Sequence, residues 1–158
     1  MSKSLKRVKA NALELGLTIS PIEMMVSTKT AQEAADAISV HLNQIAKSVI
    51  FKSERTDRAV LFLTAGGNRV DVQKAEEAHG SKLLKADAAF IRQETGFAIG
   101  GVSPIGHINP IEAFFDPNLQ TFPVIWAAAG TPHHMFEIAP QILFEAIHAK
   151  SANFTEEH

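Results

Sequence analysis

Apolar residues recur along this chain with changing spacing, and the spacing predicts which segments are helices. In residues 2–15, the apolar side chains of Leu5, Val8 and Ala12 fall every three or four positions, and Gly16 follows directly. This pattern predicts an amphipathic helix that ends at the glycine. Capping residues or an early proline introduce four further helical segments, which are residues 30–41, 71–80, 87–94 and 140–149.

Other segments are short and rich in β-branched or aromatic residues, which is typical of strands. Residues 45–52 and 59–64 flank a polar segment and predict a hairpin. Shorter strands are expected at residues 82–84, 111–115, 124–128 and 135–138. Because helices and strands alternate irregularly, the sequence predicts the α+β class and not a regular series of parallel βαβ units. The polar tail from Lys150 onward is expected to fray.

Length and charge restrict the classes of protein to consider. A chain of 158 residues without a repeat or an internal linker predicts one compact domain over residues 1–158. Its net charge of −2 gives no general basic field, so an RNA contact would have to be local, and the candidates are Lys3, Lys6, Arg7 and Lys9. The lack of cysteine excludes disulfides and thiolate nucleophiles. No apolar run could span a bilayer, so we expect a cytoplasmic protein with no membrane or DNA partner.

The segment 95–107 contains four of the nine glycines and lies between a predicted helix and a run of strands. Glycine lets a ligand approach the main chain closely, so Gly100 and Gly101 can offer bare N–H groups, although a tight turn also explains them. Ser103 lacks the Gly-x-Ser-x-Gly context of a serine hydrolase, and no acid partner is evident. A dinucleotide fingerprint is excluded because no strand precedes the glycines and no helix follows them.

Lys47 and the turn at residues 130–134 are two further candidates for chemistry. Lys47 lies among apolar strand residues, where a lysine either protects a sheet edge or reaches into a cleft to bind a phosphate or carboxylate. The turn reads Gly-Thr-Pro-His-His. A metal hydrolase that used His133 and His107 would need a further ligand such as Glu137, and the spacing matches no zinc signature. We therefore expect no metal and no other cofactor.

Three motifs together resemble a known family. They are the strand Ile-Ala-Lys47-Ser-Val-Ile, the segment Thr-Gly-Phe-x-x-Gly100-Gly101-Val-Ser-Pro104-Ile-Gly-His, and the turn Gly130-Thr-Pro-His-His. Their order is similar to that of the YbaK/prolyl-tRNA synthetase-associated domain family, and the resemblance covers nearly the whole chain. Members are free-standing or synthetase-embedded domains that edit aminoacyl-tRNA. The resemblance implies a barrel-like mixed sheet surrounded by helices.

The resemblance also implies roles for individual residues. Lys47 corresponds to a lysine that anchors the terminal adenosine phosphate of the tRNA and is needed for deacylation. The loop that contains Gly100 and Gly101 would hold the aminoacyl group, and Gly130 would open a second loop that closes the same pocket. The candidate catalytic positions are Lys47 and Gly101, and the candidate substrate-binding positions are Gly100, Ser103, Pro104, Gly130, Thr131 and His133. Backbone groups, a water and the ribose hydroxyl of the substrate would then carry the hydrolysis without a metal.

The late turn departs from the pattern of one branch of the family. Members that deacylate Cys-tRNA carry a Gly-Gly-Lys-Arg-Gly segment there, so the choice among Ala, Ser, Thr and Cys stays open. The leading hypothesis is a trans-editing hydrolase for mischarged tRNA(Pro), with prolyl-tRNA synthetase as a candidate partner. The alternative is a non-catalytic module that binds a nucleotide or the tRNA acceptor end and docks on a synthetase.

Overall fold

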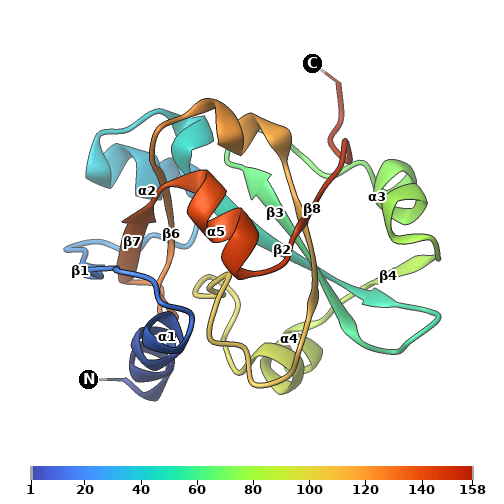
Figure 1. The fold of residues 1–158 in the computed structure, drawn as a ribbon, viewed down its shortest axis with the longest axis horizontal. Helices are drawn as coiled ribbons and strands as arrows, with labels where there is room; N and C mark the ends of the chain where they lie inside the picture. The colour runs from blue at the N-terminus through green and yellow to red at the C-terminus, as the bar shows by residue number, and fades with distance from the viewer. Residues whose placement is uncertain (1, 158) are drawn as a thin grey trace.

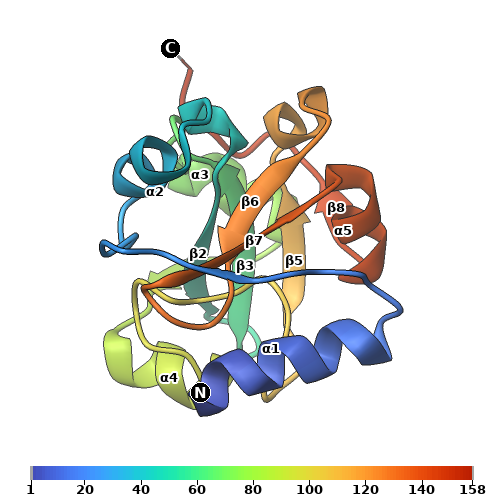
Figure 2. The same cartoon turned by 90° about the vertical axis from the view of Figure 1, so that its left-hand side faces the viewer.

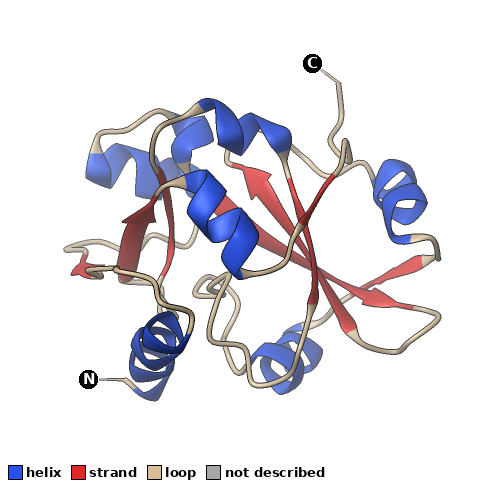
Figure 3. Cartoon of the chain, in the orientation of Figure 1, coloured by secondary structure: helices blue, strands red, loops and turns tan. Residues whose placement is uncertain are grey.

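The computed structural model describes residues 2–157, and it confirms the predicted α+β class (Figure 1). Within these residues, five α-helices and eight strands alternate irregularly, as Figure 3 shows by colour. The helices are α1 (Lys3–Glu14), α2 (Ala31–Ile38), α3 (Val72–His79), α4 (Ala88–Thr95) and α5 (Pro140–Ala146). The strands are β1 (Ile22–Glu23), β2 (Ala46–Ser53), β3 (Ala59–Ala65), β4 (Leu83–Lys85), β5 (Glu112–Phe115), β6 (Ile125–Ala128), β7 (His134–Ile138) and β8 (Lys150–Ser151).

The predicted hairpin is the centre of the larger sheet. Strands β2 and β3 pair antiparallel, from Ala46 opposite Ala65 to Lys52 opposite Ala59. The order of this sheet is β4-β2-β3-β5-β8, and the β3–β5 and β5–β8 pairs are parallel. The smaller sheet has the order β1-β7-β6 and is antiparallel. One bridge between Ile45 and Trp126 joins the two sheets, so together they form a curved, barrel-like wall.

The two faces of the larger sheet cover different cores. The larger core lies between the two sheets and includes Val8 of α1, Leu143 of α5 and Phe136 of β7. The smaller core lies on the opposite face, under α3, where the rings of Phe62 and Phe114 stack with centroids 5.0 Å apart. Figure 2 shows α1 across one end of the molecule, close to α4. No helix within residues 2–157 is long and apolar enough to cross a membrane.

Capping residues explain where most helices begin and end. Asp71 and Asp87 accept backbone N–H groups in the first turns of α3 and α4, and Gly80 and Gly96 end these helices in the left-handed region. The predicted capping box at the start of α2 is present. Helix α2 ends at Ile38 rather than at residue 41, because Ser39 adopts a left-handed φ of 61° that turns the chain toward β2.

The prediction that the tail frays from Lys150 onward was wrong. Residues Lys150 and Ser151 form β8 and pair with β5 at the edge of the larger sheet. Phe154 is fully buried, and its ring lies 5.0 Å from that of Phe62. Thr155 forms an isolated bridge with Val70. One apolar residue in an otherwise polar tail is therefore enough to anchor it, because burying a phenylalanine outweighs the loss of chain entropy.

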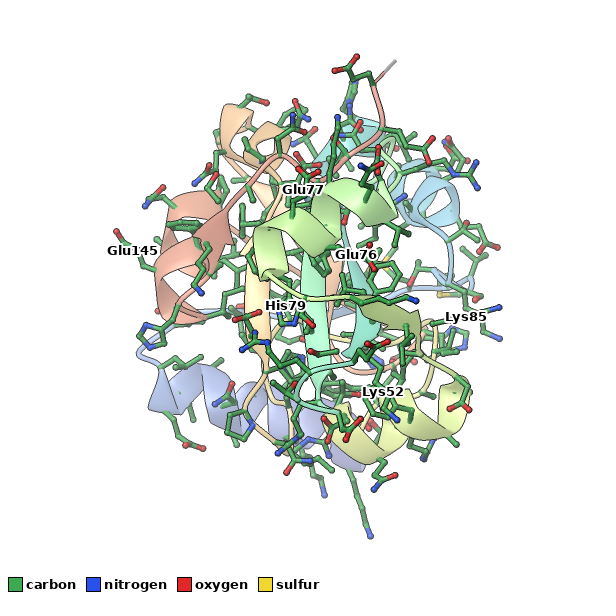
Figure 4. The ribbon with its side chains drawn as sticks, turned by 90° about the vertical axis from the view of Figure 1, so that its right-hand side faces the viewer. Lys52, Glu76, Glu77, His79, Lys85 and Glu145 are labelled. Carbon is green, nitrogen blue, oxygen red and sulfur yellow. The ribbon has the colours of Figure 1, made fainter. Side chains whose placement is uncertain are left out.

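A buried hydrogen-bond chain ties α3 to the larger sheet. His79 lies at the end of α3 (Figure 4). Its Nε2 is 2.8 Å from the hydroxyl of Ser53, and its Nδ1 is 2.5 Å from a carboxylate oxygen of Glu112. The imidazole is almost completely buried, and Ser53 has no exposed surface. The chain therefore joins the ends of α3, β2 and β5 inside the protein.

Replacing His79 by alanine is expected to lower the free energy of unfolding by about 2–3 kcal/mol, because it opens a cavity and removes the hydrogen bonds to the buried Ser53 and to Glu112. Urea denaturation followed by circular dichroism measures this loss. His133→Ala is the matched control, because His133 is exposed, and it should change stability by less than about 0.5 kcal/mol. Equal stability of the two variants would show that the hydrogen-bond chain contributes nothing.

Candidate active site

Strand β2 keeps one edge free over most of its length. Strand β4 pairs with β2 only at Phe51–Ser53, and the bridge to the smaller sheet reaches only Ile45. Between these two points, residues 46–50 pair with β3 on one side and with no strand of the described residues on the other. An unpaired strand edge presents backbone N–H and C=O groups that can bind a ligand.

Alternation along the strand shows which groups face this open edge. The N–H of Ser53 donates to Arg58 across the hairpin, at 2.9 Å, and the next N–H, that of Glu54, donates to Lys82 on the β4 side, at 3.0 Å. Backbone polar groups of an antiparallel strand point to its two neighbours in turn. The main-chain groups of Ser48 therefore point, like those of Glu54, away from β3 and toward the open edge.

A cleft of about 320 Å³ lies along this edge, between α2, α4 and the glycine segment. Figure 2 shows α2 at the upper left and α4 at the lower left of β2. Its apolar lining is Ala31, Ala34, Ile45, Ala46, Val49, Ile50, Ile91, Ile99, Val102, Ala128 and Met135. Its other lining residues are Thr28, Lys29, Thr30, Lys47, Ser48 and Gly100. An apolar cleft with a few convergent polar groups is the common form of a small-ligand site.

Lys47 is the half-buried cation of this cleft. Its Nζ donates to the carbonyl of Gly66 at 3.3 Å, and its other donors remain free for a ligand. Burial lowers the pKa of Lys47, Arg69 lowers it further, and Asp116 acts in the opposite direction. Lys52, on the opposite face of β2, lies 5.4 Å above the ring of Phe90 and close to α4 (Figure 4). A partly desolvated ammonium at a cleft is suited to bind an anion.

The structure brings the two glycine loops together. Gly100 lines the cleft with a φ of 92°, which a side chain would strain. Gly101 packs against the neighbouring turn, because a Cβ there would lie 2.9 Å from the backbone of Thr131. Its own N–H donates to the carbonyl of Ala98 at 3.0 Å. Gly130 in turn rests on α1, since an added Cβ would lie 2.9 Å from the carbonyl oxygen of Ser4.

The other candidate positions in the two loops do not line the cleft. Ser103 is fully buried, and its hydroxyl accepts the N–H of Ile105 at 3.3 Å. Pro104 faces a separate hollow between the glycine segment, α1 and α5. The hydroxyl of Thr131 lies 2.6 Å from Nδ1 of His134, and His133 is exposed. These residues shape the loops around the cleft, and their roles toward a substrate stay predictions.

The sequence made Arg7 a candidate for a local RNA contact, but in the structure its guanidinium is bound within the protein. Its Nε donates to the carbonyl of Gly106 at 2.6 Å, and its Nη2 donates to that of Gly96 at 2.9 Å. The guanidinium also lies 4.6 Å above the ring of Phe97. Arg7 therefore fastens both ends of the glycine segment to α1.

His107 at the end of the glycine segment is a partly buried histidine that is neutral at pH 7. Its Nε2 donates to the carbonyl of Ser103 at 2.6 Å, and its ring packs edge-on against Phe97 at 5.9 Å. Burial lowers the pKa of His107 to about 4, against the hydrogen bond to Ser103, and the charge of Arg7 lowers it further. Within residues 2–157, no group of three or more His, Asp or Glu side chains is placed to hold a metal ion.

This depressed pKa predicts a loss of stability in acid. An unfolded histidine has a pKa near 6.5, so between about pH 6.5 and 4 the unfolded chain binds more protons at His107 than the folded one. The contribution of neutral His107 to the free energy of unfolding is complete above pH 6.5. It is lost as the pH falls toward 4, and the loss reaches up to about 3 kcal/mol. Urea midpoints at pH 7.5 and 4.5 measure it. His107→Gln should decline less over this range, and an equal decline would exclude His107 as the cause.

Sequence reasoning missed two features. Ser53, His79 and Glu112 stand in the hydrogen-bond order of a Ser-His-acid triad, but the serine is fully buried and none of the three lines the cleft, so the set is structural. Alternation along β2 places Ser48 on the face opposite Lys47, but no role was assigned to it from the sequence, and it lines the cleft. No pattern in the sequence shows which residues of a strand line a cleft.

Known proteins resemble this chain over most of its length. The aminoacyl-tRNA editing domain family matches residues 26–146. The uncharacterized protein YwhH of Bacillus subtilis (strain 168) is 31% identical over 142 residues, which covers 90% of each chain. The crystal structure of a proposed trans-editing enzyme for prolyl-tRNA synthetase is similar with a TM-score of 0.93 and 39% identity, and 99% of both chains is covered. A proline–tRNA ligase of Macrococcus caseolyticus (strain JCSC5402) is 31% identical over 93 residues, which are 58% of this chain and 16% of the ligase. The chain belongs to the aminoacyl-tRNA editing domain family, as its three motifs predicted.

Proposed function

We propose that this protein is a trans-editing hydrolase that removes a small, non-cognate amino acid from mischarged tRNA(Pro). The observation that carries the proposal is the position of Lys47 and Gly100 in one cleft at the open edge of β2. Membership of the editing domain family supports the reaction class. The similarity to a proposed trans-editing enzyme for prolyl-tRNA synthetase and to part of a proline–tRNA ligase supports tRNA(Pro) as the substrate.

Lys47 is suited to hold the terminal nucleotide of the tRNA. An ammonium with free donors binds phosphate as a point charge, and its partial burial strengthens the attraction because less water screens it. With the phosphate bound at Lys47, the aminoacyl ester of the same nucleotide would lie deeper in the cleft, toward Gly100. Positioning of this kind lowers the entropic part of the activation barrier.

The reaction needs few side-chain functions. A water attacks the ester carbonyl, the bond between the acyl carbon and the ribose oxygen breaks, and that oxygen takes up the proton that the water loses. The products are the free amino acid and tRNA with a free terminal hydroxyl. Backbone N–H groups at the open edge of β2 and in the glycine segment can stabilise the oxyanion that forms on the carbonyl. The ribose hydroxyl next to the ester can relay the proton.

The lining of the cleft supports an amino acid with a small side chain as the substrate. The alanines of α2, Ala46 and Ala128 leave room for it, and the larger Ile91 and Met135 close the space around it. A protein with a net charge of −2 has little general attraction for tRNA, so prolyl-tRNA synthetase would be a partner that delivers the mischarged product.

A deacylation screen tests the proposed function. Purified protein is mixed with tRNA(Pro), tRNA(Ala) and tRNA(Thr), each charged with labelled alanine, serine, threonine or cysteine, and the loss of label is compared with spontaneous hydrolysis. We expect turnover of tRNA(Pro) with at least one small amino acid. Binding of uncharged tRNA without hydrolysis of any charged tRNA would contradict the proposal and favour a non-catalytic module.

A further inference from the structure

The hydroxyl of Ser48 is buried and has no hydrogen-bond partner among the described residues. Its Oγ has almost no exposed surface, and Ser27 carries the only other such side-chain atom in residues 2–157. An unpaired buried hydroxyl destabilises a protein, so native proteins rarely keep one without a function. Of these two serines, Ser48 lines the cleft and Ser27 does not.

The other hydroxyls of the cleft are already engaged. Thr28 donates its Oγ1 to the carbonyl of Pro132 at 2.8 Å. Thr30 donates its Oγ1 to the carboxylate of Glu33 and accepts the N–H of the same residue, both at 3.1 Å, within the capping box of α2. Among the described residues of the cleft wall, Ser48 is therefore the one hydroxyl whose donor and acceptor are both unused.

The side chains of Ser48 and Lys47 lie on opposite faces of β2, and both residues line the cleft. The side chain of Ser48 shares a face of β2 with Ala46 and Ile50, which belong to the larger core. Lys47 lies on the opposite face, with Val49, which packs against the smaller core. A ligand whose phosphate is held at Lys47 would therefore place its amino-acid side chain toward the other face of the strand, where Ser48 lies. Ala46 and Ile50, its neighbours on this face, are apolar, so Ser48 is the residue of β2 that offers a side-chain hydrogen bond on that side of the cleft.

We propose that Ser48 determines specificity by exchanging a hydrogen bond with a hydroxyl on the side chain of the amino acid, so that seryl esters are preferred over alanyl esters. This inference rests on the proposed function. A seryl group would satisfy Ser48 and its own hydroxyl together, whereas an alanyl group would leave Ser48 unpaired as it is now. Sites that pair with a substrate hydroxyl discriminate against the analogue without it far better than apolar pockets discriminate by size.

Kinetics of serine- and alanine-charged tRNA(Pro) test this role. The wild type should show a kcat/KM at least about tenfold higher for the seryl substrate. Ser48→Ala should bring the ratio to within about twofold, through a loss on the seryl substrate alone. Its thermal midpoint should be unchanged or higher, because the variant removes an unpaired polar group. Ser27→Ala is the matched control, since it removes the other unpaired hydroxyl outside the cleft, and it should keep the wild-type ratio.

Two results would overturn the inference while the proposed function stands. One is a seryl to alanyl ratio that Ser48→Ala leaves unchanged. The other is an equal loss on both substrates, which would mean that Ser48 contacts a group common to both, such as the α-ammonium or the ribose.

A binding measurement separates the inference from the hydrolysis. The probes are 3′-amino-3′-deoxyadenosine amides of serine and of alanine, which cannot be hydrolysed as esters, titrated by calorimetry. We expect tighter binding of the seryl amide by about tenfold in the wild type and no difference in Ser48→Ala. If this holds but no charged tRNA is hydrolysed, the proposed activity fails and the role of Ser48 stands. If the wild type binds both amides equally or binds neither, the inference fails.

Discussion

Lys47→Ala is expected to lower kcat/KM for deacylation at least about 100-fold while the protein stays folded. The variant removes the half-buried cation that would hold the phosphate of the terminal nucleotide, and a single electrostatic contact of this kind is commonly worth two to three orders of magnitude in rate. The variant should still fold, because the ammonium of Lys47 makes only one long hydrogen bond, to Gly66. Partial burial of this charge is also unfavourable, so its removal costs the fold little. Initial rates on mischarged tRNA(Pro), together with a circular dichroism spectrum, measure both effects.

The control for Lys47 lies on the same strand. Lys52→Ala removes an equal charge from the opposite face of β2, where the ammonium lies above Phe90, and should change kcat/KM less than about threefold. Lys47→Arg keeps the charge but replaces a compact ammonium by a planar fork, so it should recover only part of the activity. Deacylation by Lys47→Ala at the wild-type rate would exclude the proposed role of this lysine.

Gly101→Ala is expected to lower deacylation at least about tenfold and the free energy of unfolding by about 1–3 kcal/mol. A Cβ at this position would lie 2.9 Å from the backbone of Thr131, and backbone cannot move aside as a flexible side chain can. The glycine segment and the turn at residues 130–134 would separate, and Gly100, which lines the cleft, would shift with them. Chemical denaturation and the tRNA(Pro) assay follow the two quantities.

Gly80→Ala serves as the control for Gly101. Gly80 ends α3 with a φ of 88° and has open space around its Cα, so alanine there adds backbone strain but no steric clash. It should cost about 1 kcal/mol of stability and leave the kinetics unchanged. If Gly101→Ala behaved in the same way as Gly80→Ala, close contact between the two loops would not matter for catalysis.

The fold could be predicted where short-range chemistry determines it. The caps at Thr30, Asp71 and Asp87 act on N–H groups three residues away, so the sequence shows where α2, α3 and α4 begin. The prediction that the tail frays was wrong because Phe154 packs against residues more than 70 positions earlier in the chain, such as Val70 and Phe62. Local pattern carries no information about such a contact.

The same limit applies to the site. The glycine motif pointed to Gly100 and the strand motif to Lys47, and both residues line the cleft. The sequence could not show that the hydroxyl of Ser48 lacks a partner, because that depends on every side chain around the cleft. Nor could it show that His79 bridges Ser53 and Glu112, since the three come from separate elements.

The support that α1 gives to the glycine loops has a consequence for the boundaries of the folding unit. The segment shared with the family is residues 26–146, so α1 lies before it and Phe154 lies after it. Yet α1 carries Arg7, whose guanidinium holds the carbonyls of Gly96 and Gly106, and its backbone is the surface on which Gly130 rests. A chain trimmed to the shared segment would keep every residue of the cleft and lose the parts that hold its loops in place. The folding unit of this protein is therefore longer than the segment that it shares with the family.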